Sequence, residues 1–138
     1  MLRTAATFVL LVLLASDISA QGKTPTAKWL TGTWEGTGYQ IDNNETWTMK
    51  LTVRGRAYRI EYPSLQCGGR WIPLSLNQSR ARFIEKITDN LEACTNNGNV
   101  VVERLSRRQI AFRYANRGSG EVIASAILNR KNGKERKL

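Results

Sequence analysis

The chain has 138 residues, with 21 lysines and arginines against 11 aspartates and glutamates, two cysteines and no histidine. The lack of histidine excludes a Ser-His-Asp or Cys-His nucleophile pair, a histidine general base and every zinc site that needs an imidazole. The length allows one domain core, and the composition is too apolar for a disordered chain and too poor in cysteine for a disulfide scaffold.

The first twenty residues have the pattern of a secretory signal peptide. A positive start at Arg3 precedes an uncharged apolar run over 5–15, and a polar exit with small residues ends at Ala20, the expected cleavage site. This run is too short for a transmembrane helix, and no later apolar stretch is long enough to cross a bilayer. We therefore expect a periplasmic or secreted protein without a transmembrane segment, in which 21–28 forms a flexible lead.

Beyond the lead, apolar side chains recur at every second position, which is typical of half-buried strands. Trp47, Met49 and Leu51, for example, alternate with polar residues, and clusters of glycine and asparagine separate such runs. The strands are expected over 32–41, 46–53, 57–65, 70–76, 80–88, 99–105, 109–115 and 121–129. This spacing predicts an all-β domain over 29–129, an eight-stranded antiparallel up-and-down β-barrel, with a β-sandwich as the alternative. Residues 130–138 are predicted to form a basic tail.

Turn-forming residues lie around the end of the third strand. Pro63 is expected to end or edge that strand because it cannot donate to a ladder, and Gly68-Gly69 to form the hairpin that follows. In an up-and-down order, Cys67 and Cys94 then fall in loops at the same end of the barrel. Two cysteines of an exported domain are expected to pair, so we predict one disulfide between them.

The same strand order gathers arginines at the end that holds both termini. The residues expected there as an anion or partner site are Arg54, Arg56, Arg80, Arg107 and Arg108. Guanidinium groups dock on phosphate or carboxylate, so the candidate partners are an anionic glycan, a lipid head group or an acidic protein, and inhibition of that protein is one possible role. Nucleic acid is not expected as the physiological partner. The plainer alternative is that exposed hairpin tips simply tolerate charge.

Two stretches resemble known families. Gly32-Thr33-Trp34 is similar to the Gly-x-Trp motif that opens the first strand of calycin barrels, which include lipocalins and avidins. That resemblance implies that Trp34 plugs a closed end and that a ligand enters at the other, here the disulfide end with Asn43, Asn44 and Gln66 at its rim. The later tryptophans that wall a biotin pocket are missing, so biotin is not an expected ligand.

The second resemblance joins several strands. Tyr62-Pro63-Ser64-Leu65-Gln66-Cys67-Gly68-Gly69, followed by Phe83-Ile84-Glu85-Lys86-Ile87, Cys94 and Gly98-Asn99-Val100, resembles a signature of bacterial extracytoplasmic domains. Those domains occur as small exported proteins and as modules of larger chains, including sensor-like kinases. The resemblance implies location and a disulfide, and it brings no catalytic residue, metal or cofactor.

Two functions are therefore expected, both of them non-catalytic and both for a monomer. In the first, the basic end docks an anionic partner. In the second, the barrel carries or senses a small amphipathic ligand, with Trp47, Tyr58 and Tyr62 as walls and Glu85 as an inward carboxylate that either pairs with an arginine or holds a polar ligand. Bulky inward residues favour a filled core and thus the first function. Catalysis would need a carboxylate pair, and no spacing brings Glu35, Glu61 and Glu85 together.

Overall fold

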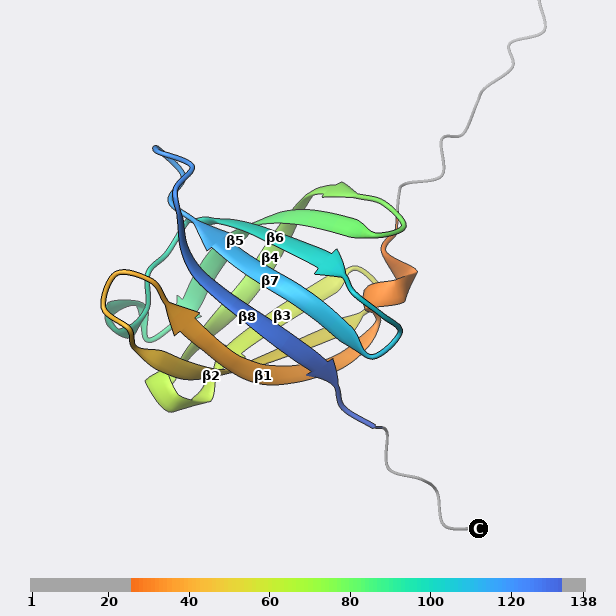
Figure 1. Ribbon diagram of the computed structural model, residues 1–138, viewed down its shortest axis with the longest axis horizontal. Coiled ribbons are helices and arrows are strands. Elements are labelled where there is room, and N and C mark those ends of the chain that lie inside the picture. The colour runs from red at the N-terminus through yellow and green to blue at the C-terminus, as the bar shows by residue number, and fades with distance from the viewer. Residues whose placement is uncertain (1–25, 133–138) are drawn as a thin grey trace, which may run out of the picture.

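A computed structural model describes residues 26–132 of the chain as a closed eight-stranded barrel (Figure 1). The strands are β1 (Gly32–Gln40), β2 (Thr46–Arg54), β3 (Ala57–Tyr62), β4 (Cys67–Leu76), β5 (Arg80–Asp89), β6 (Asn99–Arg104), β7 (Gln109–Ala115) and β8 (Val122–Arg130). Each strand pairs antiparallel with the next, and β1 pairs with β8. The predicted up-and-down barrel is confirmed, and the sandwich alternative is excluded. The predicted signal peptide, residues 21–25 of the lead and residues 133–138 of the tail lie outside the described residues.

The alternation seen in the sequence sorts side chains between core and surface. On β2, Trp47, Met49, Leu51 and Val53 are buried, whereas the residues between them are exposed or half-buried. Three aromatic rings fill the middle of the barrel: the Trp71 ring centroid lies 5.4 Å from that of Phe83 and 5.7 Å from that of Phe112. The middle of the barrel interior is therefore packed with side chains, as the sequence predicted.

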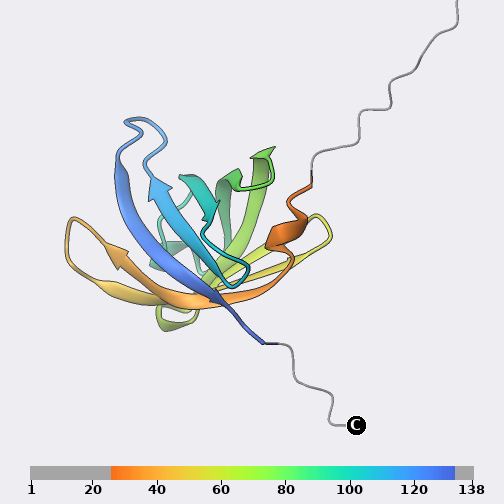
Figure 2. The same ribbon diagram turned by 45° about the vertical axis from the view of Figure 1, so that its right-hand side comes forward.

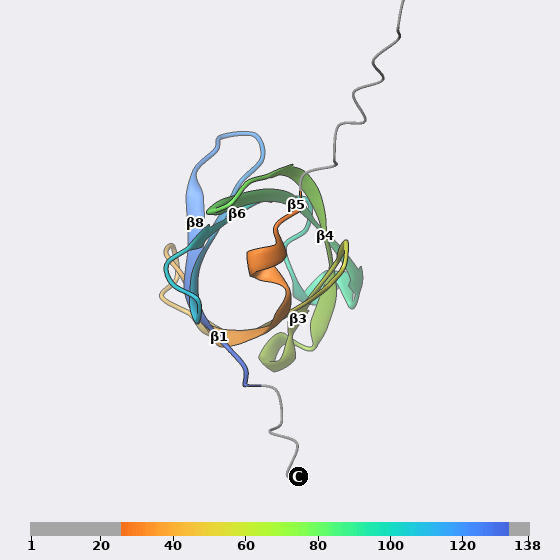
Figure 3. The same ribbon diagram turned by 90° about the vertical axis from the view of Figure 1, so that its right-hand side faces the viewer.

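One end of the barrel is closed by the 3-10 helix η1 (Lys28–Leu30), which lies across the opening in Figure 3. Leu30 is fully buried, and its carbonyl accepts a 2.8 Å hydrogen bond from Trp34 Nε1. The Arg130 guanidinium lies 4.1 Å from the centroid of the Trp34 ring and donates to the carbonyls of Trp29 and Arg107 at 2.8 and 3.0 Å. We call the end of the barrel that η1 covers the closed end. Arg130 thus belongs to β8 and to the closed end rather than to the tail.

The opposite end, which we call the mouth, is formed by the β1–β2, β3–β4, β5–β6 and β7–β8 connections. In Figure 2 the β1–β2 and β7–β8 loops extend on the side away from η1. The predicted disulfide between Cys67 and Cys94 is confirmed and joins the start of β4 to the β5–β6 connection, with the two Cα atoms 6.3 Å apart. It therefore ties together two neighbouring parts of the mouth.

The β3–β4 connection differs from the prediction. The turn is made by the 3-10 helix η2 (Pro63–Leu65) and by Gln66, whose φ of 57° is left-handed, while Gly68 and Gly69 lie inside β4. Pro63 ends β3, as predicted. Gly69 is needed for close approach: a Cβ there would lie 2.0 Å from the Lys86 carbonyl, beside an irregularity in the β4–β5 register. The predicted Gly68-Gly69 hairpin is wrong because these glycines let two strands approach closely.

Candidate functional site

The mouth contains a cavity of about 230 Å³. Small residues lie on the β1–β8 wall of the mouth: Ala124, which lines the cavity, is opposite Gln40, and Gly38 is opposite Ala126. The Trp47 ring takes the space over Gly38, since a Cβ on Gly38 would lie 2.5 Å from Trp47 Cε2. All three small residues are buried. At Ala124 the short side chain leaves open space in the mouth. Side chains lining the cavity are Gln40, Asn43, Glu45, Thr46, Trp47, Tyr62, Leu65, Glu85, Ala93, Cys94, Thr95, Phe112, Tyr114, Ile123 and Ala124.

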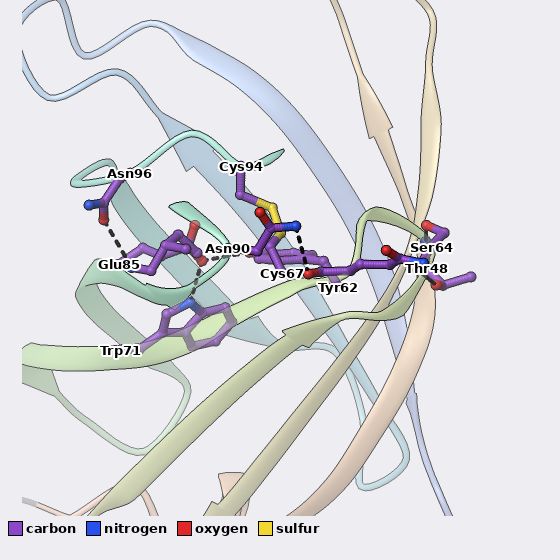
Figure 4. Close-up of a disulfide and its surroundings, with 11 residues drawn as sticks. Thr48, Tyr62, Ser64, Cys67, Trp71, Glu85, Asn90, Cys94 and Asn96 are labelled. Atoms are coloured by element: carbon purple, nitrogen blue, oxygen red, sulfur yellow. Dashed lines mark hydrogen bonds between the residues drawn. A yellow bond between two sulfur atoms is a disulfide. The ribbon is translucent and has the colours of Figure 1, made fainter. Parts of the chain in front are cut away.

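Glu85 is the one buried charged residue within 26–132, and it is 2% exposed. Its Oε2 accepts hydrogen bonds from the Tyr62 hydroxyl at 2.5 Å and from Trp71 Nε1 at 2.8 Å (Figure 4). The three residues come from β5, β3 and β4. The sequence left open an arginine or a ligand as the partner of Glu85, and in the structure both protein partners are uncharged donors.

Burial dominates the acid–base behaviour of this cluster. It raises the pKa of Glu85 from 4.5 to about 7, against the effect of the two hydrogen bonds, which stabilise the ionised form. It also raises the pKa of Tyr62 well above the ordinary range of a phenol, and the neighbouring Glu85 adds to that rise. Tyr62 therefore stays protonated and donates its hydrogen bond at any physiological pH.

Tyr114, on β7, has a buried hydroxyl without a hydrogen-bond partner among the described residues. Its side chain is almost fully buried, and burial together with Glu85 raises its pKa to about 12, which the nearby amide of Gly98 partly offsets. The hydroxyl forms no hydrogen bond with that amide. The phenol lies so close to Gly98 that a Cβ at this position would be 2.0 Å from Tyr114 Cζ. Gly98 thus makes room for a buried hydroxyl that the protein itself leaves unpaired.

Three of the four residues that the sequence suggested for an interior ligand lie around the cavity. Trp47, Tyr62 and Glu85 line it, whereas Tyr58 packs deeper against Phe83, with ring centroids 4.8 Å apart. The sequence reasoning did not single out Tyr114 or Ala124. The direction of the strands could have placed these two residues at the mouth. Because β7 runs towards the mouth and β8 starts there, inward residues at those two strand ends must lie close together.

The five arginines suggested for an anion or partner site are all exposed at the closed end. Arg80 pairs with Glu103 at 3.7 Å, and Arg108 donates to Asn132 at 2.6 Å. Within 26–132, the side chains of Arg54, Arg56 and Arg107 make no hydrogen bond or ion pair. Of the five arginines that the sequence suggested, these three therefore have guanidinium groups without a protein partner among the described residues, and we call them the uncommitted arginines.

The remaining chemistry of the described residues is sparse. Glu35 and Glu61 lie on the outside of the barrel, where they pair with Lys131 at 2.8 Å and Lys50 at 3.4 Å, away from Glu85. No group of three or more acidic or cysteine side chains within 26–132 is placed to hold a metal ion. In the same range no helix is long and apolar enough to cross a membrane. Comparison with protein-family models, curated proteins and solved structures finds no match for the chain.

Proposed function

We propose that this chain is an exported, non-catalytic binding protein that holds a small molecule in the mouth cavity. The observation that carries the proposal is the pair of polar groups there: the Glu85 carboxyl and the orphan Tyr114 hydroxyl, both buried among aromatic rings. A buried polar group without a partner costs about 1–3 kcal/mol, so a fold that keeps one beside a cavity is suited to an occupant that supplies the missing bond.

The rest of the molecule fits such a role. The closed end and the ring-packed middle form a rigid support, and the disulfide holds two of the four mouth connections. A disulfide is typical of proteins outside the cytoplasm, which agrees with the predicted signal peptide. The Gly-x-Trp resemblance to calycin barrels implies the same polarity, with a plugged end opposite a ligand mouth.

A ligand-observed NMR screen tests this proposal. The probes are ring-sized fragments, such as indole and benzyl alcohol, and the blocking variant is Ala124→Phe, whose ring would occupy the cavity. Ala57→Phe, on an exposed alanine at the closed end, is the matched control. We expect fragment binding in wild type and Ala57→Phe and its loss in Ala124→Phe, provided that all three unfold cooperatively. Equal binding by all three proteins would refute the cavity as the site.

The charge at the closed end supports a second candidate function, docking on an anionic partner such as a lipid head group, an anionic glycan or an acidic protein. Its connections carry Arg56, Arg107 and Arg108 and no acidic residue, with Arg54 and Arg80 beside them. Such a surface attracts anions from solution and binds less tightly as salt rises.

Sedimentation with vesicles containing phosphatidylglycerol tests the docking function. Removing the three uncommitted arginines by Arg54→Ser, Arg56→Ser and Arg107→Ser should abolish co-sedimentation. The control removes the same charge elsewhere by Arg70→Ser, Lys86→Ser and Arg117→Ser. Docking through the closed end is wrong if both triple variants lose the same amount of binding.

A further inference from the structure

The free acceptor in the mouth cavity belongs to Glu85. Both of its hydrogen bonds end on Oε2, and within 26–132 no donor reaches Oε1 and no lysine or arginine pairs with this carboxylate. The carboxylate is already buried in the folded protein without a ligand, and hydrogen bonds from Tyr62 and Trp71 hold its position (Figure 4). An occupant that donates a hydrogen bond to Oε1 would complete the coordination of this group.

The Tyr114 hydroxyl narrows the class of occupant. It lies near enough to Glu85 for the carboxylate charge to raise its pKa, and it has no partner of its own. A single group with several N–H donors can serve both oxygens, since a phenol oxygen also accepts. An ammonium has three donors and no acceptor, which suits an arrangement of a carboxylate and a hydroxyl.

The surroundings of these two oxygens also favour positive charge. Trp47, Tyr62 and Phe112 line the cavity together with Tyr114, and aromatic faces attract cations by about 0.5–2 kcal/mol. The mouth connections also favour a cation, because they carry one arginine and four carboxylates, those of Asp42, Glu45, Glu92 and Glu121. Although the chain has a net charge of +10, the mouth is thus its acidic end.

The volume sets the size. A cavity of about 150 Å³ can hold benzene, so about 230 Å³ accommodates one ring with a short arm. We infer that the occupant of the mouth cavity is a small organic cation, a primary amine on a short arm from one ring, with the ammonium between Glu85 Oε1 and the Tyr114 hydroxyl. This inference rests on the proposed ligand-binding function.

Calorimetry with three probes of nearly equal shape tests the charge preference: 2-phenylethylamine, 2-phenylethanol and phenylacetate. At about pH 8, where Glu85 with a pKa of about 7 is ionised, the amine should bind about tenfold more tightly than the alcohol. Phenylacetate should bind least. Glu85→Gln should remove the preference for amine over alcohol and keep the affinity for the alcohol.

Tyr114→Phe provides a variant that does not depend on changing the carboxylate. Because the hydroxyl is buried and unpaired, its removal should leave the unfolding midpoint unchanged or raised. The same change should weaken amine binding several-fold and leave binding of the alcohol less affected. Equal affinity of wild type and Tyr114→Phe for the amine would show that the hydroxyl does not contact the ammonium and would overturn the proposed geometry.

Different results would overturn the cation inference and the proposed ligand-binding function. If the alcohol or phenylacetate binds at least as tightly as the amine, and Ala124→Phe blocks it, the cation inference is overturned and the cavity remains a binding site. The inference also fails, alone, if fragments of the neutral screen bind and none of the three probes does. If no fragment of any class binds in a way that Ala124→Phe abolishes, the proposed function falls together with the inference.

Discussion

Replacing Glu85 by glutamine should stabilise the protein in neutral and alkaline solution and leave its stability in mild acid nearly unchanged. Glutamine has the shape of glutamate, and its carbonyl oxygen can accept the hydrogen bonds that Oε2 accepts from Tyr62 and Trp71. What the substitution removes is the ability to carry charge at a position that is 2% exposed. The variant therefore isolates the cost of ionising this carboxyl.

The sign and the size follow from the raised pKa. An unfolded chain releases the Glu85 proton near pH 4.5, whereas the folded chain keeps it until about pH 7. The stabilisation from the bound proton is therefore complete below pH 4.5 and is lost as the pH rises through about 7. Each tenfold difference in proton affinity is worth about 1.4 kcal/mol, which gives a loss of about 3 kcal/mol above pH 7. Glu85→Gln should escape that loss.

Urea unfolding followed by tryptophan fluorescence, at intervals from about pH 5 to about pH 8, measures this difference. The chain has no histidine, so no imidazole titration obscures the window. Glu92→Gln, at an exposed position of the mouth, controls for the removal of one negative charge from a basic protein. The reasoning is refuted if the difference in unfolding free energy between Glu85→Gln and wild type does not change with pH.

Three further predictions concern the supports of the site. Gly98→Ala should destabilise the protein strongly and shift the Tyr114 ring resonances, since the new Cβ would overlap the phenol, whereas Gly118→Ala, with nothing within 4 Å, should have little effect in the same urea assay. Replacing Cys67 and Cys94 by serine should lower the unfolding free energy by about 3.5 kcal/mol on the chain-entropy model; an unchanged urea midpoint would contradict this. Arg130→Lys should lower the thermal midpoint by several degrees, because lysine lacks the planar fork that covers Trp34 and reaches the Trp29 carbonyl in η1. A midpoint equal to that of wild type would show that the closed end does not depend on the guanidinium.

Much of the fold could be predicted from the sequence because one physical rule dominates it. A strand with one face in the core must alternate, and the alternation around Met49 and Phe112 gave strand positions that lie close to those of the structure. Local turn chemistry was less informative. The Gly68-Gly69 pair has the composition of a hairpin, but its role is long-range, at an irregular β4–β5 register that no local pattern encodes.

The candidate site was harder to predict because it depends on where side chains fail to fill the barrel interior. Bulky inward residues indicated a filled barrel, but the mouth cavity lies beside the small side chain of Ala124, on the last strand. The sequence predicted Glu85 as an inward carboxylate, and in the structure it is buried. Its hydrogen-bond partners could not be deduced, since they depend on the stagger between three strands.

The indole N–H signals of the chain's four tryptophans test the central claim, that the mouth cavity holds a small molecule, most directly. Trp47 lines the cavity and Trp71 donates to Glu85, whereas Trp29 and Trp34 lie at the closed end. The protein is titrated with 2-phenylethylamine and, separately, with 2-phenylethanol, and the titrations are followed by ¹H–¹⁵N NMR. We expect saturable shifts of the Trp47 and Trp71 signals, whereas the signals of Trp29 and Trp34 should not move. Shifts confined to the closed-end pair, or no shift of any indole with either compound, would contradict the central claim.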